Sequence, residues 1–235
     1  MSRGVYIKMG NIYHLGRHRL MCGDSTNPDD VAKLMNGVKA DLVFTDPPYG
    51  IKYQSGHRVR SAPFDMIIND DKILDFLPII KEYNTGFVFI MTIWKTIKDW
   101  IIEFEKHFKI TDIIVWYKKG GGMGDLQRTF SPSYEMILCS NNGKKICGKR
   151  LENVWSVPRD NRNCYFHPTQ KPIALPMMAI ENTTKENDIV LDLFGGSGST
   201  LFACEKLNRS CYTMEISEKY IDIIINRYET LQKGF

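Results

Sequence analysis

Residues 189–200, which read IVLDLFGGSGST, join a short apolar run to a turn rich in glycine. Glycine tolerates positive φ and lets the backbone approach a ligand closely, and the start of a following helix offers free N–H groups. Such a turn at the carboxyl end of a strand is typical of a nucleotide or nucleoside site. The pattern departs from the dinucleotide fingerprint G-x-G-x-x-G, and no Gly-Lys-Ser/Thr follows, so a P-loop is not expected.

A second strand is predicted about twenty residues after this turn, and it ends in an acid. Residues 210–214 read SCYTM, and Glu215 follows them. An acid at this place binds the ribose hydroxyl groups in nucleotide-binding α/β proteins. The alternative is that Glu215 only caps a helix that begins near Ser217. The pairing of glycine turn and acid favours ribose binding.

The rest of the chain alternates strand-sized apolar runs with helical stretches. Residues 27–30, Asn-Pro-Asp-Asp, are typical of a helix start because a capping Asn precedes Pro and two acids. Helices are predicted from residue 27 and at residues 72–83, 94–107, 172–183, 200–208 and 217–232. Strands are predicted at residues 18–22, 41–45, 87–92, 110–117, 134–140, 188–193 and 210–215. Seven strands with interleaved helices predict an α/β sheet that is mostly parallel.

Length and composition predict one globular domain over residues 1–235. Hydrophobic residues make up 43% and charged residues 25% of the chain, close to the globular average. No apolar run approaches the ~18 residues of a membrane helix, and the first four residues open no signal peptide. The six cysteines form no C-x-x-C pair. We therefore expect a cytoplasmic protein with reduced thiols, no metal and no membrane partner.

Positive charge is concentrated in two segments. Residues 117–171 carry ten Lys or Arg and four acids, a net +6 in a chain of net +4. Residues 50–63 lack apolar periodicity, and they carry basic side chains but no Asp or Glu. This composition is typical of a mobile basic loop. A polyanionic partner fits this distribution. The alternative is a solvated loop region whose charge asymmetry arose by chance.

The sharpest motif is Thr45-Asp46-Pro47-Pro48-Tyr49-Gly50, directly after a predicted strand. The two prolines fix φ and donate no N–H, which leaves their carbonyl groups free as acceptors. The Asp46 carboxylate and the Pro47 carbonyl can together accept both protons of an amino group, and Tyr49 offers a flat face on which a ring can stack. The alternative is an ordinary Pro-Pro turn.

Three motifs together identify a family resemblance. Asp46-Pro47-Pro48-Tyr49 resembles the catalytic motif of the amino-group DNA methyltransferases, and residues 192–198 resemble their S-adenosylmethionine loop. Residues 167–172, His-Pro-Thr-Gln-Lys-Pro, resemble the segment that precedes this loop in the circularly permuted β-class members. The order of the motifs is the β-class order, and the resemblance spans residues 10–232.

The resemblance implies a Rossmann-like methyltransferase sheet of seven strands, six parallel and one antiparallel, in permuted order and with helices on both faces. The cofactor would be S-adenosylmethionine, with S-adenosylhomocysteine as product and no metal. Met214 departs from the family, which often has Gly before the ribose acid. The carried-over cofactor residues are Asp24, Thr169, Lys171, Asp192, Phe194, Gly195, Gly196, Ser197, Gly198 and Glu215. The alternative for Asp24 is a helix-capping acid.

The implied reaction transfers a methyl group to the exocyclic amino group of adenine in double-stranded DNA, after the base flips out of the helix. The catalytic residues would be Asp46, Pro47, Pro48 and Tyr49. The cytosine amino group is the alternative target, although its enzymes lean to Ser-Pro-Pro-Tyr. RNA or protein amide methylation, an NAD-binding Rossmann protein and a catalytically inactive DNA-binding relative are further alternatives that explain the motifs less well.

DNA contacts are expected from the loop at residues 50–63 and from a small target-recognition insertion at about residues 120–166. The short insertion leaves a homodimer open, and the family predicts a prokaryotic or phage-infected cell. Trp155, Tyr165 and Phe166 are expected in the core rather than on DNA. The candidate DNA-binding residues are Lys52, His57, Arg58, Arg60, Lys118, Lys119, Arg128, Arg159 and Arg162.

Overall fold

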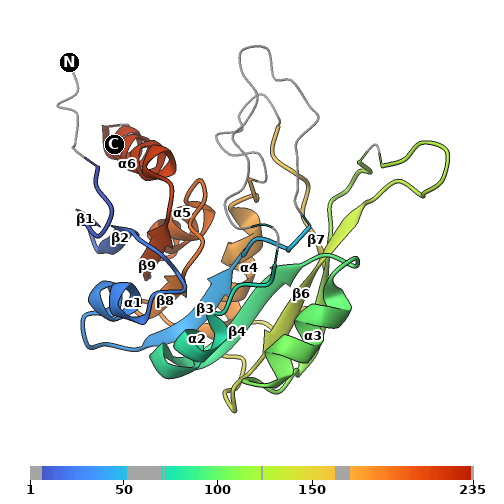
Figure 1. Ribbon diagram of the computed structural model, residues 1–235, viewed down its shortest axis with the longest axis horizontal. Helices are drawn as coiled ribbons and strands as arrows, with labels where there is room; N and C mark the ends of the chain where they lie inside the picture. The colour runs from blue at the N-terminus through green and yellow to red at the C-terminus, as the bar shows by residue number, and fades with distance from the viewer. Residues whose placement is uncertain (1–6, 52–69, 71, 123, 162–169, 234–235) are drawn as a thin grey trace.

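A computed structural model describes residues 7–51, 70, 72–122, 124–161 and 170–233 of the chain (Figure 1). Nine strands in these residues form one sheet, in the order β1-β2-β9-β8-β3-β4-β6-β5-β7. The strands are β1 (Ile12–Leu15), β2 (His18–Cys22), β3 (Ala40–Thr45), β4 (Asn84–Thr92), β5 (Asp112–Tyr117), β6 (Tyr134–Ser140), β7 (Val154–Ser156), β8 (Ile189–Asp192) and β9 (Ser210–Glu215).

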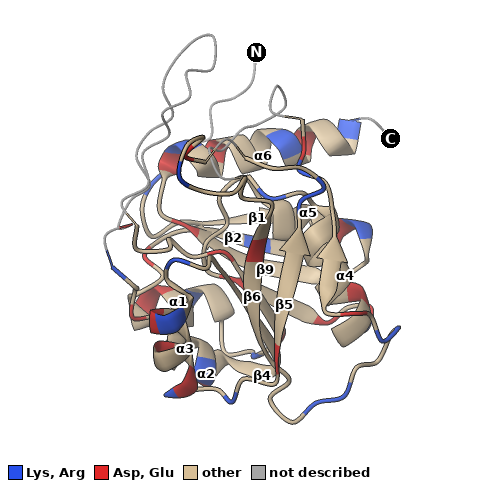
Figure 2. Ribbon diagram, turned by 90° about the vertical axis from the view of Figure 1, so that its right-hand side faces the viewer, with Lys and Arg blue, Asp and Glu red and all other residues tan. Residues whose placement is uncertain are grey.

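Three helices cover each face of this sheet, as Figure 2 shows edge-on. The helices on one face are α1 (Pro28–Met35), α2 (Leu77–Tyr83) and α3 (Ile97–Glu105). Those on the other face are α4 (Ala174–Thr183), α5 (Ser199–Lys206) and α6 (Glu218–Lys233). Side chains alternate along β3, so that Leu42 and Phe44 pack against α4 to α6 while Val43 packs against α1 to α3.

The α/β fold class and its mostly parallel sheet are confirmed, and all seven predicted strands are present. The strand number was predicted wrongly, because β1 and β7 extend the sheet to nine. Both are edge strands of only three or four residues, which is too short for an apolar run or an alternation to stand out in the sequence. Strand β6 runs antiparallel to both its neighbours, and β1 runs antiparallel to β2.

Local signals explain where the helices begin. The Asn27 side chain accepts a hydrogen bond from the Asp29 N–H at 3.0 Å and Pro28 opens α1, as the sequence predicts. Helix α2 begins at Leu77 rather than at residue 72, because Pro78 occupies its first turn and fixes the entry.

Strand direction decides which loops share an edge of the sheet. Strands β2, β9, β8, β3, β4 and β5 all end at one edge, called here the carboxyl edge. Residues 118–133 join β5 to β6 at this edge and project from it (Figure 1). Because β6 runs the other way, residues 141–153 lie at the opposite edge. The expected insertion at 120–166 is therefore divided between two ends of the molecule.

The described residues also bear on the cysteines and on membranes. Cys22, Cys139, Cys147, Cys204 and Cys211 are free thiols in this part of the chain, and Cys164 lies outside it. None of the helices described here is both long and apolar enough to cross a membrane.

Candidate active site at the carboxyl edge

Two turns that are far apart in sequence meet at the carboxyl edge. Strands β3 and β8 are parallel neighbours, with Val43 opposite Leu191. Asp46 follows β3, and the glycine turn follows β8. The Thr45 hydroxyl donates to the Asp192 carboxylate at 2.8 Å and ties the two strand ends together. The expected catalytic turn and the expected cofactor turn are thus side by side.

Asp46 is held by donors on both of its carboxylate oxygens. The Tyr49 hydroxyl lies 2.7 Å from Oδ1 and 3.0 Å from Glu135 Oε2. Lys171 Nζ donates to Oδ2 at 2.6 Å and lies 3.5 Å from Glu135 Oε2. Lys171 is 7% exposed, whereas the Asp46 side chain keeps 21% exposure. Asp46 is therefore oriented by its neighbours and still reachable.

Lys118 completes this group, called here the Asp46 cluster: Asp46, Tyr49, Lys118, Glu135 and Lys171. Lys118 follows β5, and its Nζ lies 2.5 Å from Glu135 Oε1. Strands β5 and β6 pair Trp116 with Glu135, and Lys118 follows two residues after Trp116. This register places Lys118 and Glu135 at the same edge of the sheet. Lys118 was expected to contact DNA, but it is 7% exposed and ion-paired within the cluster, which leaves it little access to a phosphate.

Burial and charge compete in setting the pKa values of this cluster. Burial raises the pKa of Asp46 above its ordinary value, and the Lys171 ammonium opposes that rise. Burial also disfavours ionised Glu135, yet Lys171 and Lys118 outweigh it and lower the pKa of Glu135. Burial disfavours the Lys171 ammonium, but Asp46 and Glu135 together raise the pKa of Lys171. Burial lowers the pKa of Lys118 despite Glu135.

The glycine turn needs its glycines for close packing and for positive φ. The Gly195 N–H donates to the Met214 carbonyl at 2.7 Å, and a Cβ on Gly195 would lie 2.7 Å from Thr213 Oγ1. Gly196 and Gly198 have φ of +52° and +87°. Phe194 packs edge-on against Phe76, with ring centroids 4.9 Å apart. Ser197 is buried beside α5. The turn thereby runs close to the end of β9.

Glu215 joins the glycine turn to the start of α6. Its Oε2 accepts from the Gly196 N–H and its Oε1 from the Ser217 N–H, both at 2.8 Å. The capping contact that the sequence left as an alternative is therefore present, together with a second contact to the turn. Burial raises the pKa of Glu215 to about 7, and burial raises that of Asp192 to about 6.

Asp24 lies at the same edge, next to Glu215. The Gly23 N–H donates to the Glu215 carbonyl at 3.1 Å, which places the ends of β2 and β9 together. The Asp24 carboxylate accepts from the Thr26 N–H and hydroxyl at 2.9 and 2.8 Å, and it is half-buried. It caps the turn before α1, while Asn27 caps the helix itself.

The other predicted residues are dispersed. Lys119 and Arg128 are exposed on the projecting loop 118–133, and Arg159 is half-buried near Gly122. Trp155 is buried in the core against Phe89, as expected. Outside the described residues lie Lys52, His57, Arg58, Arg60, Arg162, Tyr165, Phe166 and Thr169, with most of the loop 50–63. Within the described residues, no three His, Cys, Asp or Glu side chains are grouped to hold a metal.

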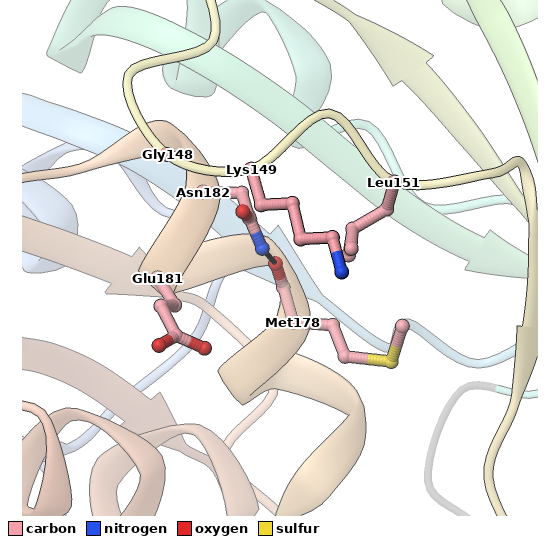
Figure 3. A pocket seen from close by; sticks show the side chains of 6 residues that line it. All are labelled: Gly148, Lys149, Leu151, Met178, Glu181 and Asn182. Carbon is pink, nitrogen blue, oxygen red and sulfur yellow. Dashed lines mark hydrogen bonds between the residues drawn. The ribbon is translucent and has the colours of Figure 1, made fainter.

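The basic residues of the other half of the insertion lie far from this site. Residues 141–151 run along the opposite edge, where Lys and Arg are drawn blue beside α4 (Figure 2). The Cys147 and Gly148 N–H groups donate to the Asn182 carbonyl at 3.0 and 3.1 Å. A shallow pocket opens there between this segment and α4, lined by Lys149 and Met178 among others (Figure 3). It shares no residue with the Asp46 cluster.

Sequence reasoning missed Glu135. The available signal was an acid inside the predicted strand 134–140, directly before Met136-Ile137-Leu138. A charged residue beside such an apolar run needs a partner when it is buried. The sequence does not show that the partners are Lys118 and Lys171.

Comparisons with known proteins agree with this geometry. The sequence pattern of a family described as DNA methylase matches residues 40–226. The type II methyltransferase M.HpaI of Haemophilus parainfluenzae is 29% identical, with 92% of this chain and 76% of that protein covered. The type II methyltransferase M2.DpnII of Streptococcus pneumoniae is 28% identical, with 85% and 87% covered.

Solved structures share the fold. The crystal structure of an M1.HpyAVI–SAM complex superposes with a TM-score of 0.66 at 24% identity, with 88% of this chain and 98% of that chain covered. The cytosine-N4-specific PvuII DNA methyltransferase superposes with a TM-score of 0.62 at 14% identity, with 95% of each chain covered.

Proposed function

Because this chain belongs to the DNA methylase family, we propose that it methylates the exocyclic amino group of adenine in double-stranded DNA, with S-adenosylmethionine as methyl donor. The observation that carries the proposal is the contact between the Asp46-Pro47-Pro48-Tyr49 turn and the glycine turn, tied by Thr45 and Asp192 at 2.8 Å. An amine held by one turn would face a methyl group held by the other.

The residues of the carboxyl edge fit the methyl donor. Asp24 and Glu215 place two carboxylates at the ends of the adjacent strands β2 and β9, where they can accept from amino and hydroxyl groups. The glycine residues of the turn carry no side chains, so a ligand can approach the backbone beside Glu215 closely. When bound, S-adenosylmethionine supplies a methyl group from its sulfonium and becomes S-adenosylhomocysteine. We propose that Asp192, Phe194, Gly195, Gly196, Ser197 and Gly198 complete its site together with Lys171. Thr169 lies outside the described residues, and its part in the site stays a prediction from the sequence.

The Asp46 turn is suited to activate a weak amine. The lone pair of an exocyclic amino group is delocalised into its ring, so the nitrogen is a poor nucleophile. Hydrogen bonds from its two protons to the Asp46 carboxylate and the Pro47 carbonyl would localise that lone pair and stabilise the positive charge that develops on nitrogen. Pro48 would keep the turn rigid. The flipped base would stack on Tyr49, whose ring also lies 5.4 Å from Lys171 Nζ.

We propose that the loop 118–133 contacts DNA. It projects from the carboxyl edge, so it can reach the duplex around a base bound at Asp46 (Figure 1). Arg128 is exposed there, and the apolar side chains of Leu126 and Phe130 are 82% and 99% exposed. A cation would bind phosphate, and exposed apolar side chains can contact bases or a groove.

Because the loop is short, a homodimer is left open as a source of further DNA contacts. Sedimentation with and without DNA tests whether the protein forms this homodimer.

Sequencing with detection of modified bases tests the proposed function directly. The protein is expressed in a methylation-deficient bacterial host, beside an Asp46→Ala control, and the host DNA is read. We expect 6-methyladenine at one sequence motif in the first culture and none in the second. Detection of 4-methylcytosine instead would replace adenine by cytosine as the target, and unmodified DNA would refute the proposal.

A further inference from the structure

Asp46 shares its two hydrogen-bond donors with a second carboxylate. Glu135 Oε2 lies 3.0 Å from the Tyr49 hydroxyl and 3.5 Å from Lys171 Nζ, and these are the same two groups that hold Asp46. A hydroxyl has one proton and donates to one acceptor at a time. The two carboxylates therefore compete for the Tyr49 proton, and they share the Lys171 ammonium, which has three N–H groups to donate.

This competition matters because the donors occupy the acceptor that the reaction needs. An Asp46 oxygen that is fully committed to the Lys171 ammonium is a weaker acceptor for an incoming amino group. If Lys171 and Tyr49 shift their hydrogen bonds toward Glu135, Asp46 regains that capacity without leaving a buried ammonium unpaired. Breaking a buried pair without a substitute partner is strongly unfavourable.

Lys118 fixes Glu135 for this role. Its Nζ contacts the other oxygen of Glu135 at 2.5 Å, so that Oε2 stays directed at Tyr49 and Lys171. Four charges then alternate through the cluster, two carboxylates and two ammonium groups, and they sum to zero when all are ionised. Glu135 reaches Asp46 through Tyr49 and Lys171.

We propose that Glu135 is a positioning residue for methyl transfer, which shares Lys171 and Tyr49 with Asp46 and so sets how strongly Asp46 accepts the amino group. This inference rests on the proposed function. Lys118 acts one step further away by holding Glu135. Among the residues that the structure describes, the other ionisable groups that face the cluster are Asp192, across Thr45, and Arg159, beyond Lys118.

The inference predicts opposite effects for two substitutions. In Glu135→Gln, Lys171 keeps its ion pair with Asp46 but loses the one with Glu135, and a negative charge that raises the pKa of Asp46 is removed. The acid limb of the methylation rate should move to lower pH, and the rate on its plateau should fall at least about tenfold. In Lys118→Met, Glu135 attracts Lys171 more strongly, so the acid limb should move to higher pH.

The test measures single-turnover methylation of unmethylated plasmid DNA with tritiated S-adenosylmethionine, between pH 5 and 9. Glu103→Gln is the matched control, because Glu103 also pairs with a lysine, Lys106 at 2.6 Å, but lies on the surface of α3. The control should leave the rate and the acid limb unchanged. The double variant Lys118→Met/Glu135→Gln should show the same limb as Glu135→Gln alone, because Lys118 acts through Glu135.

The outcomes separate this inference from the proposed function. An unsubstituted protein that transfers no methyl group contradicts the proposed function itself. An active protein whose acid limb stays in place in both single variants overturns the role of Glu135 and leaves the proposed function intact. Thermal unfolding identifies a variant that does not fold. If Glu135→Gln does not fold, the pH at which the acid limb of Lys118→Met lies tests the role of Glu135.

Discussion

The affinity for S-adenosylmethionine should depend on pH through Glu215. Burial raises the pKa of this carboxyl to about 7, so about half of the free protein carries a neutral Glu215 at neutral pH. The ribose hydroxyl groups of the proposed ligand would donate to the carboxylate, and such hydrogen bonds favour the ionised form. Binding should therefore select the ionised protein and release a proton.

The size of this effect on Kd follows from the fraction of the protein in which Glu215 is ionised. The apparent Kd is the intrinsic Kd divided by the fraction with ionised Glu215. With a pKa of about 7, this raises Kd about elevenfold at pH 6 and by only about a tenth at pH 8. Titration calorimetry in two buffers of different ionisation enthalpy should also find about half a proton released at pH 7.

Glu215→Gln supplies the control for this experiment. It should bind the ligand about tenfold more weakly at pH 8, because hydrogen bonds to a charged acceptor are lost, and its Kd should no longer change between pH 7 and 8. Any remaining dependence near pH 6 would belong to Asp192, whose pKa is about 6. A flat Kd in the unsubstituted protein, or uptake of a proton on binding, would refute the reasoning.

Three further changes probe the rest of the site. Asp46→Ala should lower methyl transfer at least about a hundredfold but leave S-adenosylmethionine affinity within a few-fold by calorimetry; substantial activity would remove Asp46 from the mechanism. Gly195→Ala should lower the free energy of unfolding by about 1–3 kcal/mol, since its Cβ would lie 2.7 Å from a buried hydroxyl oxygen; an unchanged denaturant midpoint would contradict this packing. Arg128→Glu should weaken DNA binding and reduce its salt slope by about one or two, whereas Lys145→Glu, at the opposite edge, should leave the slope unchanged in the same titration. Equal effects of the two charge reversals would show that DNA reaches both edges.

The stability of the free protein should change with pH for the same reason as its affinity. The folded-state pKa of Glu215, about 7, exceeds the ordinary value of 4.5. Its contribution to stability is therefore complete below pH 4.5 and is lost as the pH rises through 7. That contribution is about 3 kcal/mol. The urea midpoint of unfolding, measured without ligand, should therefore be lower at pH 8 than at pH 5.

The sequence by itself determined most of the sheet and both turns of the site. Runs such as residues 87–91 and 189–191 are apolar because their strands are covered on both faces, and that requirement is visible residue by residue. The Asp46 turn and the glycine turn are equally local, since proline and glycine restrict or free the backbone wherever they stand. The family resemblance rests on these local features, and the match over residues 40–226 confirms it.

The tertiary structure alone decided the partners of Asp46 and the division of the basic region. Glu135 and Lys118 meet Lys171 because β5 and β6 pair beside β4 in one particular register. Residues 141–151 lie away from Asp46 because β6 runs antiparallel to its neighbours and carries the chain to the opposite edge. An apolar run predicts a strand but not its neighbours or its direction, because every strand presents the same backbone groups for pairing.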